Sequence, residues 1–330
     1  MKVLYMMTKP NEESEKTIHE ILDESAELVF YSDLNDDEKD VSLSQADIIL
    51  GFSLSEEQLQ KAKNLKLQQT FATGVDRHLL KIFKERGIVF SNNHGHAFII
   101  AEFGFALLNA ASKELIQNDQ LLRKGDWHPR KYNSVTLFNK TLLFLGYGEI
   151  AKSFKKLVEP FNMKLIAIKK SKESDDSDVK IYLPEKKLEA IKQADFIFNS
   201  LPKTPKTVNF LDKEEFDSMK SSAIVINVGR GDTINDEALY NALKEKKIKG
   251  AAIDTWYIYP DKRGGEEQEP MPCYPSKLPF HELDNIIMSP HRAWATDLSL
   301  FEITKELLLN INRFIRGEQL VNIVDLDEGY

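Results

Sequence analysis

Residues 141–151, with the sequence TLLFLGYGEIA, constrain the fold of this chain more than any other stretch. The apolar residues at its start predict a short buried strand, and Gly146 and Gly148 predict a tight turn after it. A helix that begins at such a turn directs free backbone N–H groups and a positive dipole end at one place. With Ala151 in the place of a third glycine, the pattern is typical of a loop that binds a dinucleotide pyrophosphate. An ordinary tight turn is the alternative, and the rest of the chain has to decide between the two.

Composition narrows the class of protein and its partners. The chain has 330 residues, of which 42% are hydrophobic and 29% charged, so two soluble domains with sizeable cores are expected. A formal net charge of -8 argues against nucleic acid or an anionic membrane as a partner. One cysteine, Cys273, excludes an intramolecular disulfide and fits a reducing compartment. No signal peptide or membrane span is predicted, which favours the cytoplasm.

Strand and helix signals alternate along the chain, which predicts two parallel sheets wrapped by helices, that is, an α/β protein with doubly wound domains. The first set of expected strands covers 2–7, 27–31, 46–52, 67–72 and 88–91. The second set begins with the glycine-motif strand and continues with 164–168, 179–183, 196–201, 223–228, 250–254 and 286–289. A last helix is expected over 298–315, and one more strand over 321–326.

A single long helix is expected over residues 98–122. Its first half is apolar nearly all round, so it must be buried on more than one side. A core helix and a subunit interface both explain this, and the two explanations are compatible. Glu102 is a charge in apolar surroundings, and a paired structural carboxylate is favoured there over a catalytic one.

Several further stretches carry a family resemblance. They are LPKTPKT at 201–207, INVGRG at 226–231 followed by DEAL at 236–239, GAAID at 250–254, SPH at 289–291 and LVNIVD at 320–325. Together with the glycine motif, they resemble the D-isomer-specific 2-hydroxyacid dehydrogenase family over nearly the whole chain. The resemblance implies a flavodoxin-like substrate domain made of residues 1–97 plus 295–330. It also implies a Rossmann NAD(P)-binding domain, residues 98–294, inserted into it, and a homodimer through the helix at 98–122.

The implied activity is hydride transfer between NAD(P)H and a small 2-keto acid or D-2-hydroxy acid, of the glyoxylate or hydroxypyruvate type. Arg230 suits the substrate carboxylate and the keto oxygen, because its planar fork is permanently charged. His291 suits proton donation and uptake, since imidazole titrates near neutral pH. Backbone N–H groups at Thr73, Gly74 and Val75 would give the second carboxylate contact. The alternatives are a surface ion-pairing arginine and a structural histidine. No metal site is predicted.

One position departs from the family. The glutamate that usually supports the protonated histidine is replaced by Tyr259. A neutral phenol cannot stabilise an imidazolium as a carboxylate does. Either Glu266, Glu267 or Glu269 folds back towards the imidazole, or the histidine works without an anionic partner. In the second case the pKa of His291 should fall, and reductive activity should be confined to lower pH.

The coenzyme preference depends on the end of the second strand of the nucleotide fold. An acidic residue there usually bonds the ribose 2′-hydroxyl of NAD. This chain has Lys169 and Lys170 instead, which favours NADP(H) over NAD. The alternative is that these lysines belong to a solvated surface run without a role in coenzyme binding. By resemblance, Asp254 bonds the nicotinamide carboxamide. The other expected coenzyme contacts are Gly146, Gly148, Glu149, Ile150, Leu201, Pro202, Thr207, Val228, Gly229 and His291.

Two rival functions stay open at this level. A dinucleotide-sensing protein with a dehydrogenase fold would bind coenzyme tightly and turn over little. Formate oxidation on the same scaffold is the second, because it uses a neutral group near the histidine.

Overall fold

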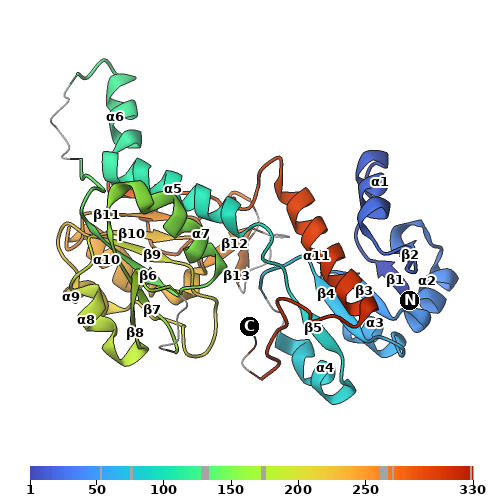
Figure 1. Ribbon diagram of the computed structural model, residues 1–330. Helices are drawn as coiled ribbons and strands as arrows, with labels where there is room; N and C mark the ends of the chain where they lie inside the picture. The colour runs from blue at the N-terminus through green and yellow to red at the C-terminus, as the bar shows by residue number, and fades with distance from the viewer. Residues whose placement is uncertain are drawn as a thin grey trace. The chain divides into compact units, whose positions relative to one another are not determined.

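The computed structural model of the chain describes residues 1–52, 54–74, 77–127, 134–171, 176–260, 267–269, 271–327 and 329. Two compact units are present (Figure 1): Met1–His96 together with Thr296–Tyr330, here called unit 1, and Ala97–Ala295, called unit 2. Each unit is a parallel sheet with helices on both faces, which confirms the predicted α/β class. Among the described residues, no helix is long and apolar enough to cross a membrane.

Unit 1 contains a five-stranded parallel sheet in the order β2-β1-β3-β4-β5, which is the doubly wound order of flavodoxin-like domains. Its strands are β1 (Lys2–Tyr5), β2 (Glu27–Phe30), β3 (Ile48–Gly51), β4 (Leu67–Thr70) and β5 (Val89–Ser91). Its helices are α1 (Glu12–Ile21), α2 (Asp36–Gln45), α3 (Glu56–Lys61), α4 (Leu80–Arg86) and α11 (Ser299–Arg316). Side chains that cap helix N-termini, such as Ser55 before α3, explain why these helices begin where they do.

The C-terminal helix α11 completes the core of unit 1, although it lies some 200 residues away in the sequence. Its buried face includes Leu307, Leu308 and Ile311, which belong to one apolar cluster with residues of the sheet. The expected strand over 321–326 is wrong, because only an isolated antiparallel bridge joins Ser91 to Ile323. Asn322 has a φ of 54°, in the left-handed region, and that conformation interrupts an extended strand.

Unit 2 contains a seven-stranded parallel sheet in the order β14-β11-β10-β9-β6-β7-β8. This is the Rossmann order with one strand added at an edge. Its strands are β6 (Thr141–Leu145), β7 (Lys164–Ile168), β8 (Val179–Tyr182), β9 (Phe196–Asn199), β10 (Ile224–Asn227), β11 (Gly250–Ile253) and β14 (Ile286–Met288). Its helices are α5 (Ala97–Lys113), α6 (Leu115–Leu122), α7 (Glu149–Val158), α8 (Lys187–Ile191), α9 (Lys213–Ser218) and α10 (Asp236–Lys244).

Both faces of this sheet are covered by apolar clusters, which explains the unbroken apolar runs in its central strands. Because all seven strands are parallel, their carboxyl ends meet at one edge of the sheet and their amino ends at the other. The residue that follows each strand is therefore brought to the same edge as its counterparts.

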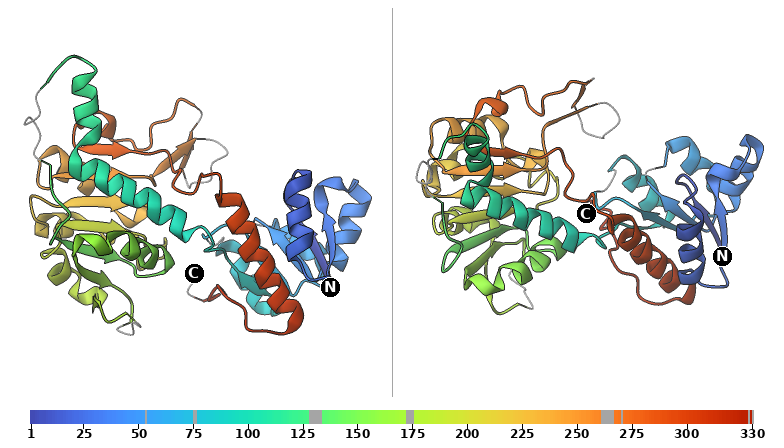
Figure 2. Two further views of the ribbon diagram at one scale, coloured as in Figure 1. Left: turned by 45° about the horizontal axis from the view of Figure 1, so that its top comes forward. Right: turned by 90° about the horizontal axis from the view of Figure 1, so that it is seen from above.

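The helix expected over 98–122 is two helices, so that prediction is wrong in one respect. α5 ends at Lys113, Glu114 takes a left-handed φ of 50°, and α6 leaves in a new direction (Figure 2). Neither glycine nor proline signals this break. Glu114 is buried and forms an ion pair with Lys249, which precedes β11, and this contact fixes the turn.

The segment around and after Tyr259 contains further regular structure. β12 (Ile258–Pro260) pairs in parallel with β13 (Glu267–Glu269), and Tyr259 lies opposite Gln268. Phe280–Glu282 forms a short 3-10 helix whose Phe280 is buried in the core.

Candidate active site

The glycine turn lies at the carboxyl end of β6, as the sequence predicts. Gly146 has a φ of 79°, and a Cβ there would lie 3.2 Å from Leu201 Cδ2, so a side chain would be strained. Gly148 caps α7, and a Cβ there would meet nothing within 4 Å. Glu149 and Ile150 form the first turn of α7. The helix N-terminus thus opens onto space beside Gly148, which fits the approach of a pyrophosphate.

Three side chains fasten the next loop to this turn. Tyr147 donates from its phenol to Asp176 Oδ2 at 2.6 Å, and Lys155 Nζ lies 2.7 Å from Asp176 Oδ1. Lys155 and Tyr147 hold the pKa of Asp176 below its usual range, while burial, followed by the bond to Asp176, raises the pKa of Tyr147. Asp176 was not singled out from the sequence, and it brings a carboxylate close to the glycine turn.

Lys169 and Lys170 follow the carboxyl end of β7, one strand away from the glycine turn. The backbone N–H of Lys169 donates to Tyr182 O at 3.0 Å, while the side chain of Lys170 is exposed. This is the position at which a doubly wound sheet meets the adenosine ribose.

The loop after β9 contains three of the expected coenzyme contacts. Leu201 is half-buried and Pro202 is exposed. Thr207 folds the loop back on itself, since its hydroxyl donates to Pro202 O at 2.6 Å and accepts from the Thr204 N–H at 2.7 Å.

Arg230 follows β10 and is held in a crowded backbone. Val228 before it is buried, and a Cβ on Gly229 would lie 2.7 Å from Leu201 O, so only glycine fits there. The Arg230 Nη1 donates to Gly229 O at 2.8 Å. Burial lowers the pKa of the guanidinium, while the nearby Tyr259 opposes this shift.

Asp254 follows β11 and is fully buried. Its carboxylate accepts from the Ser289 hydroxyl, from the Arg292 N–H at 2.9 Å and from the Ala293 N–H at 3.1 Å. These donors all belong to the segment after β14 that carries His291. The observed bonds of Asp254 therefore hold that segment.

His291 is half-buried and has a φ of 51°, a left-handed conformation that is uncommon outside glycine. Its ring meets the edge of the Tyr259 ring, with the centroids 5.5 Å apart and the planes at 62°. The carbonyl of His291 accepts from Trp294 Nε1 at 3.2 Å. Histidine and tyrosine thus lie side by side, as the family resemblance implied for this position.

A backbone hydrogen bond holds Tyr259 beside the histidine. Its phenol oxygen accepts from the Trp256 N–H at 3.0 Å, and burial raises the pKa of the phenol while Arg230 lowers it. Glu266 lies outside the described residues, and β13, which includes Glu267 and Glu269, is described through its backbone.

The residues expected to bind the second carboxylate oxygen belong to unit 1. Thr73 and Gly74 follow β4 at the carboxyl edge of the five-stranded sheet. Thr73 O accepts from Asn92 Nδ2 at 2.8 Å, which fixes the start of this turn. Val75 lies outside the described residues.

Three buried polar residues at the carboxyl edge of unit 2 were missed by the sequence reasoning: Asn199, Asn227 and Thr233. Two of them end strands that otherwise consist of apolar residues, and that position was the available signal. Asn227 and Thr233 both donate hydrogen bonds to the backbone carbonyl of Arg230.

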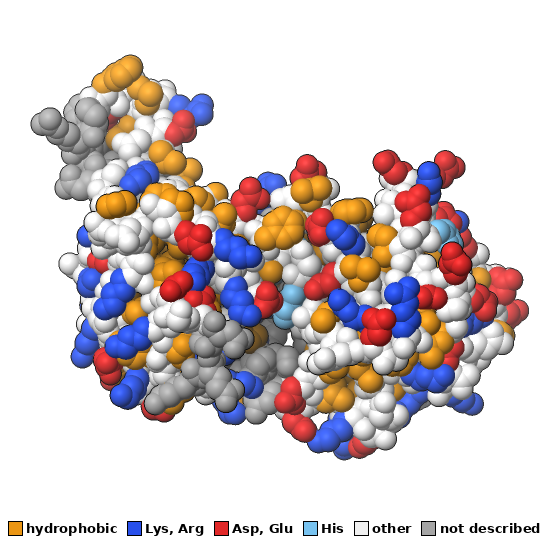
Figure 3. Space-filling view, viewed as in Figure 1, with side chains coloured by type: hydrophobic (Ala, Val, Ile, Leu, Met, Phe, Trp, Pro, Cys, Tyr) orange, Lys and Arg blue, Asp and Glu red, His pale blue; other side chains and the backbone are white. Residues whose placement is uncertain are grey.

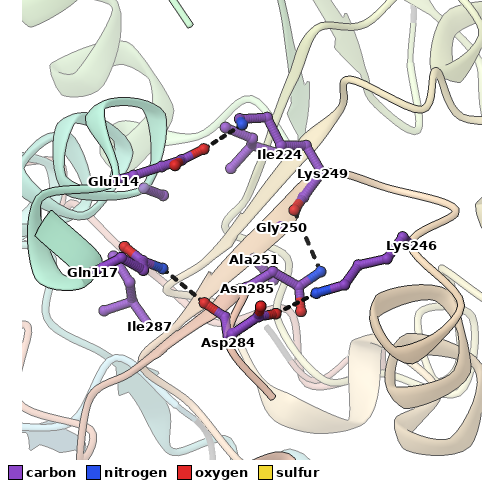
Figure 4. A pocket seen from close by; sticks show the side chains of 11 residues that line it. Glu114, Gln117, Ile224, Lys246, Lys249, Gly250, Ala251, Asp284, Asn285 and Ile287 are labelled. Atoms are coloured by element: carbon purple, nitrogen blue, oxygen red, sulfur yellow. Dashed lines mark hydrogen bonds and ion pairs between the residues drawn. The ribbon is translucent and has the colours of Figure 1, made fainter. Parts of the chain in front are cut away.

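A cavity of about 170 Å³ lies at the opposite, amino edge of the same sheet (Figure 4). Its lining includes the ion pair of Glu114 with Lys249 and the bond from Gln117 Nε2 to Asp284 O at 2.9 Å. This cavity is separate from the strand ends that carry Arg230 and His291. Within the described residues, no group of three or more His, Cys, Asp or Glu side chains could hold a metal ion.

The comparison with known proteins is consistent with this geometry. Residues 105–293 match the family model for the NAD-binding domain of D-isomer-specific 2-hydroxyacid dehydrogenases. The D-3-phosphoglycerate dehydrogenase of Methanocaldococcus jannaschii is 30% identical over 93% of this chain, which spans 57% of that protein's length. The glyoxylate reductase of Thermococcus litoralis is 30% identical over 83% of this chain and 81% of that protein. An acyclic imino acid reductase solved with NADPH and D-Arg is 25% identical, with a TM-score of 0.76 over 98% of this chain and 100% of that one. The chain belongs to the D-isomer-specific 2-hydroxyacid dehydrogenase family.

Proposed function

We propose that this protein transfers a hydride between NAD(P)H and a small 2-keto acid or D-2-hydroxy acid, of the glyoxylate or hydroxypyruvate type. The observation that carries the proposal is the contact of Tyr259 with His291 at the same edge of the sheet as Arg230, which follows a strand two places away from β14. An acid–base group and a permanent cation then border one place at the carboxyl edge of the Rossmann sheet. Ligands of open α/β sheets bind at that edge.

The bound coenzyme would supply the hydride, and the residues of the chain would do the rest. The glycine turn at Gly146 and Gly148 would take the pyrophosphate at the N-terminus of α7. Arg230 would bind the substrate carboxylate and polarise the keto oxygen. His291 would give its proton to that oxygen during reduction and recover it during oxidation. Thr73, Gly74 and Val75 of unit 1 would contribute the second carboxylate contact.

A spectrophotometric screen tests this function directly. Oxidation of NADPH and of NADH is followed at 340 nm with glyoxylate, hydroxypyruvate and other 2-keto acids. Reduction of NAD⁺ or NADP⁺ by formate is measured in parallel, to test for formate oxidation. Turnover with at least one small 2-keto acid is expected. Tight coenzyme binding without turnover on the whole panel would favour a dinucleotide-sensing protein instead.

We propose NADPH as the preferred coenzyme. The support is the position of Lys169 and Lys170 directly after β7, where a 2′-phosphate would meet two cations. The structural relative that was solved with NADPH agrees with this. The ratio of kcat/KM for NADPH and NADH measures the preference, and Lys170→Glu should move that ratio towards NADH. A wild-type preference for NADH would contradict the proposal.

A homodimer is the proposed assembly, with the cytoplasm as its location. α6 presents Leu115, Ile116 and Leu122 to solvent, and Trp127 beyond it is 80% exposed, so a second copy would cover an apolar surface. The exposed apolar residues over α6 are visible in Figure 3. Analytical ultracentrifugation should give twice the chain mass for the wild type, and Ile116→Glu should shift the protein towards the monomer.

A further inference from the structure

Two asparagines lie side by side at the carboxyl ends of neighbouring strands. Asn199 ends β9, Asn227 ends β10, and the two residues are partners in the ladder. They are 0% and 1% exposed, respectively. Asn199 Nδ2 donates to Asn227 Oδ1 at 2.9 Å and to the hydroxyl of the buried Thr233 at 2.7 Å. We call these three residues the amide bridge.

The amide bridge bonds the two loops that leave these strands. Asn199 Oδ1 accepts from the Leu201 N–H at 3.1 Å, in the loop after β9. Asn227 Oδ1 accepts from the Gly229 N–H at 3.0 Å, in the loop after β10. Each of the two carboxamide oxygens thus fixes the backbone two residues further along its own chain segment, while the amide–amide bond joins the segments.

The carbonyl of Arg230 is enclosed by the same group. It accepts from the Thr233 hydroxyl at 2.6 Å, from the Thr233 N–H at 3.2 Å and from Asn227 Nδ2 at 3.3 Å. A Cβ on Gly231 would lie 2.1 Å from Trp256 O, so the backbone after Arg230 is confined on that side as well. The Arg230 backbone therefore has one well-defined conformation. The side chains that fix it are neutral, so they do not neutralise the positive charge of the guanidinium.

We propose that Asn199, Asn227 and Thr233 are positioning residues that hold Arg230 and the loop of Leu201 in a fixed relation to one another. This inference rests on the proposed function, in which Arg230 faces the substrate carboxylate and Leu201 faces the coenzyme. A buried and fully bonded polar network favours a single arrangement over alternatives. The amide bridge accordingly couples the geometry of the substrate site to that of the coenzyme site.

Substitutions at Thr233, which bonds Arg230, and at Asn199, which bonds Leu201, should have different effects on the two KM values. Thr233→Val keeps the shape of the side chain but removes the hydroxyl that donates to Arg230 O and accepts from Asn199 Nδ2. We expect the KM for the 2-keto acid to rise about tenfold, because Arg230 O loses its closest donor. The KM for the coenzyme should stay within about twofold, because Asn199 keeps its bonds to Leu201 and Asn227. Asn199→Leu removes the bonds to both loops, and both KM values should rise.

Asn285→Leu is the matched control. Asn285 is a half-buried asparagine of the same unit that donates to two backbone carbonyls, Leu243 O at 3.2 Å and Lys249 O at 3.3 Å, at the opposite edge of the sheet. Its replacement should lower the melting temperature without changing either KM. A general loss of stability would affect the control and the bridge variants alike, whereas a positioning role separates them.

The outcomes distinguish this inference from the proposed function. If the wild type reduces a 2-keto acid and Thr233→Val leaves both KM values within twofold, the positioning role is refuted and the function stands. If the wild type reduces none, the function fails, and crystal structures of the wild type and Thr233→Val decide the inference. A displaced Arg230 in the variant would support the positioning role, and an unchanged Arg230 would overturn it.

Discussion

The two edges of the seven-stranded sheet treat buried polar groups in opposite ways. At the carboxyl edge, the side chains of Asn199, Asn227 and Asp254 are fully buried and every one of them is bonded to neighbouring loops. At the amino edge, Gln117 Oε1 and Asn285 Oδ1 are buried, and no partner reaches them among the described residues. Glu114 lines the cavity at this edge, and its Oε2 is also buried without a hydrogen-bond partner among the described residues.

Buried side-chain hydrogen bonds are therefore concentrated at the carboxyl edge of the sheet. A satisfied buried network fixes backbone geometry, while an unpaired buried oxygen costs free energy and fixes nothing. The backbone of the loops at the carboxyl edge is thereby fixed, and the amino edge tolerates a cavity. Thr255 is the exception at the carboxyl edge, because its hydroxyl has no partner among the described residues. Substitutions at the two edges should therefore have unequal effects on activity.

The largest difference is expected from histidines. His291→Ala should lower kcat by about 10²–10⁴-fold, because general acid–base catalysis contributes about that much. Coenzyme affinity, measured by fluorescence titration, should survive. His281→Ala is the control, since His281 is exposed and stacks on Tyr274 elsewhere in unit 2. Near-normal turnover of His291→Ala would remove His291 from the reaction.

A smaller difference in kcat and stability is expected when an aspartate is replaced by asparagine at each edge. Asp254→Asn replaces a carboxylate oxygen by an amide that cannot accept all three present donors, so a buried N–H loses its partner. We expect unfolding free energy to fall by about 1–3 kcal/mol and kcat to fall about tenfold as the His291 segment shifts. Urea unfolding and steady-state kinetics measure the two effects.

Asp284→Asn is the counterpart at the amino edge. Its carboxylate pairs with Lys246 at the surface, with 63% of the side chain exposed, and exposed pairs contribute little. Both unfolding and kcat should stay near the wild-type values. Equal losses in the two variants would show that the edges do not differ in the way described.

Much of the fold was readable because its signals are local. Alternating strand and helix patterns predicted the doubly wound class, and Gly146 and Gly148 marked a strand–turn–helix that the structure confirms. Within unit 2, Arg230, Asp254 and His291 follow strand ends, and parallel pairing alone then brings them to one edge of the sheet. The roles assigned to them stay predictions, which the substitutions above test.

What the sequence did not reveal depends on distant contacts. The expected long helix breaks at Glu114, which pairs with Lys249. The sequence gives no local sign of this break, because Lys249 lies 135 residues away. The left-handed Asn322 ends the expected last strand, although the pattern around it is apolar. Asn199 and Asn227 looked like ordinary strand ends, since their importance comes from lying side by side across neighbouring strands. Local propensity carries no record of such pairings.

The smallest effect is expected at Gln117, on the rim of the cavity. Its Nε2 donates to Asp284 O at 2.9 Å, while its buried Oε1 lacks a partner among the described residues. Gln117→Met keeps the length of the side chain, gives up one hydrogen bond and removes one unpaired oxygen, so the two effects should nearly cancel. We expect the unfolding free energy to change by less than about 1 kcal/mol and kcat to stay unchanged. A loss of about 2 kcal/mol or more would show that the oxygen is bonded, by water or by a second copy of the chain, and that the amino edge is as well satisfied as the carboxyl edge.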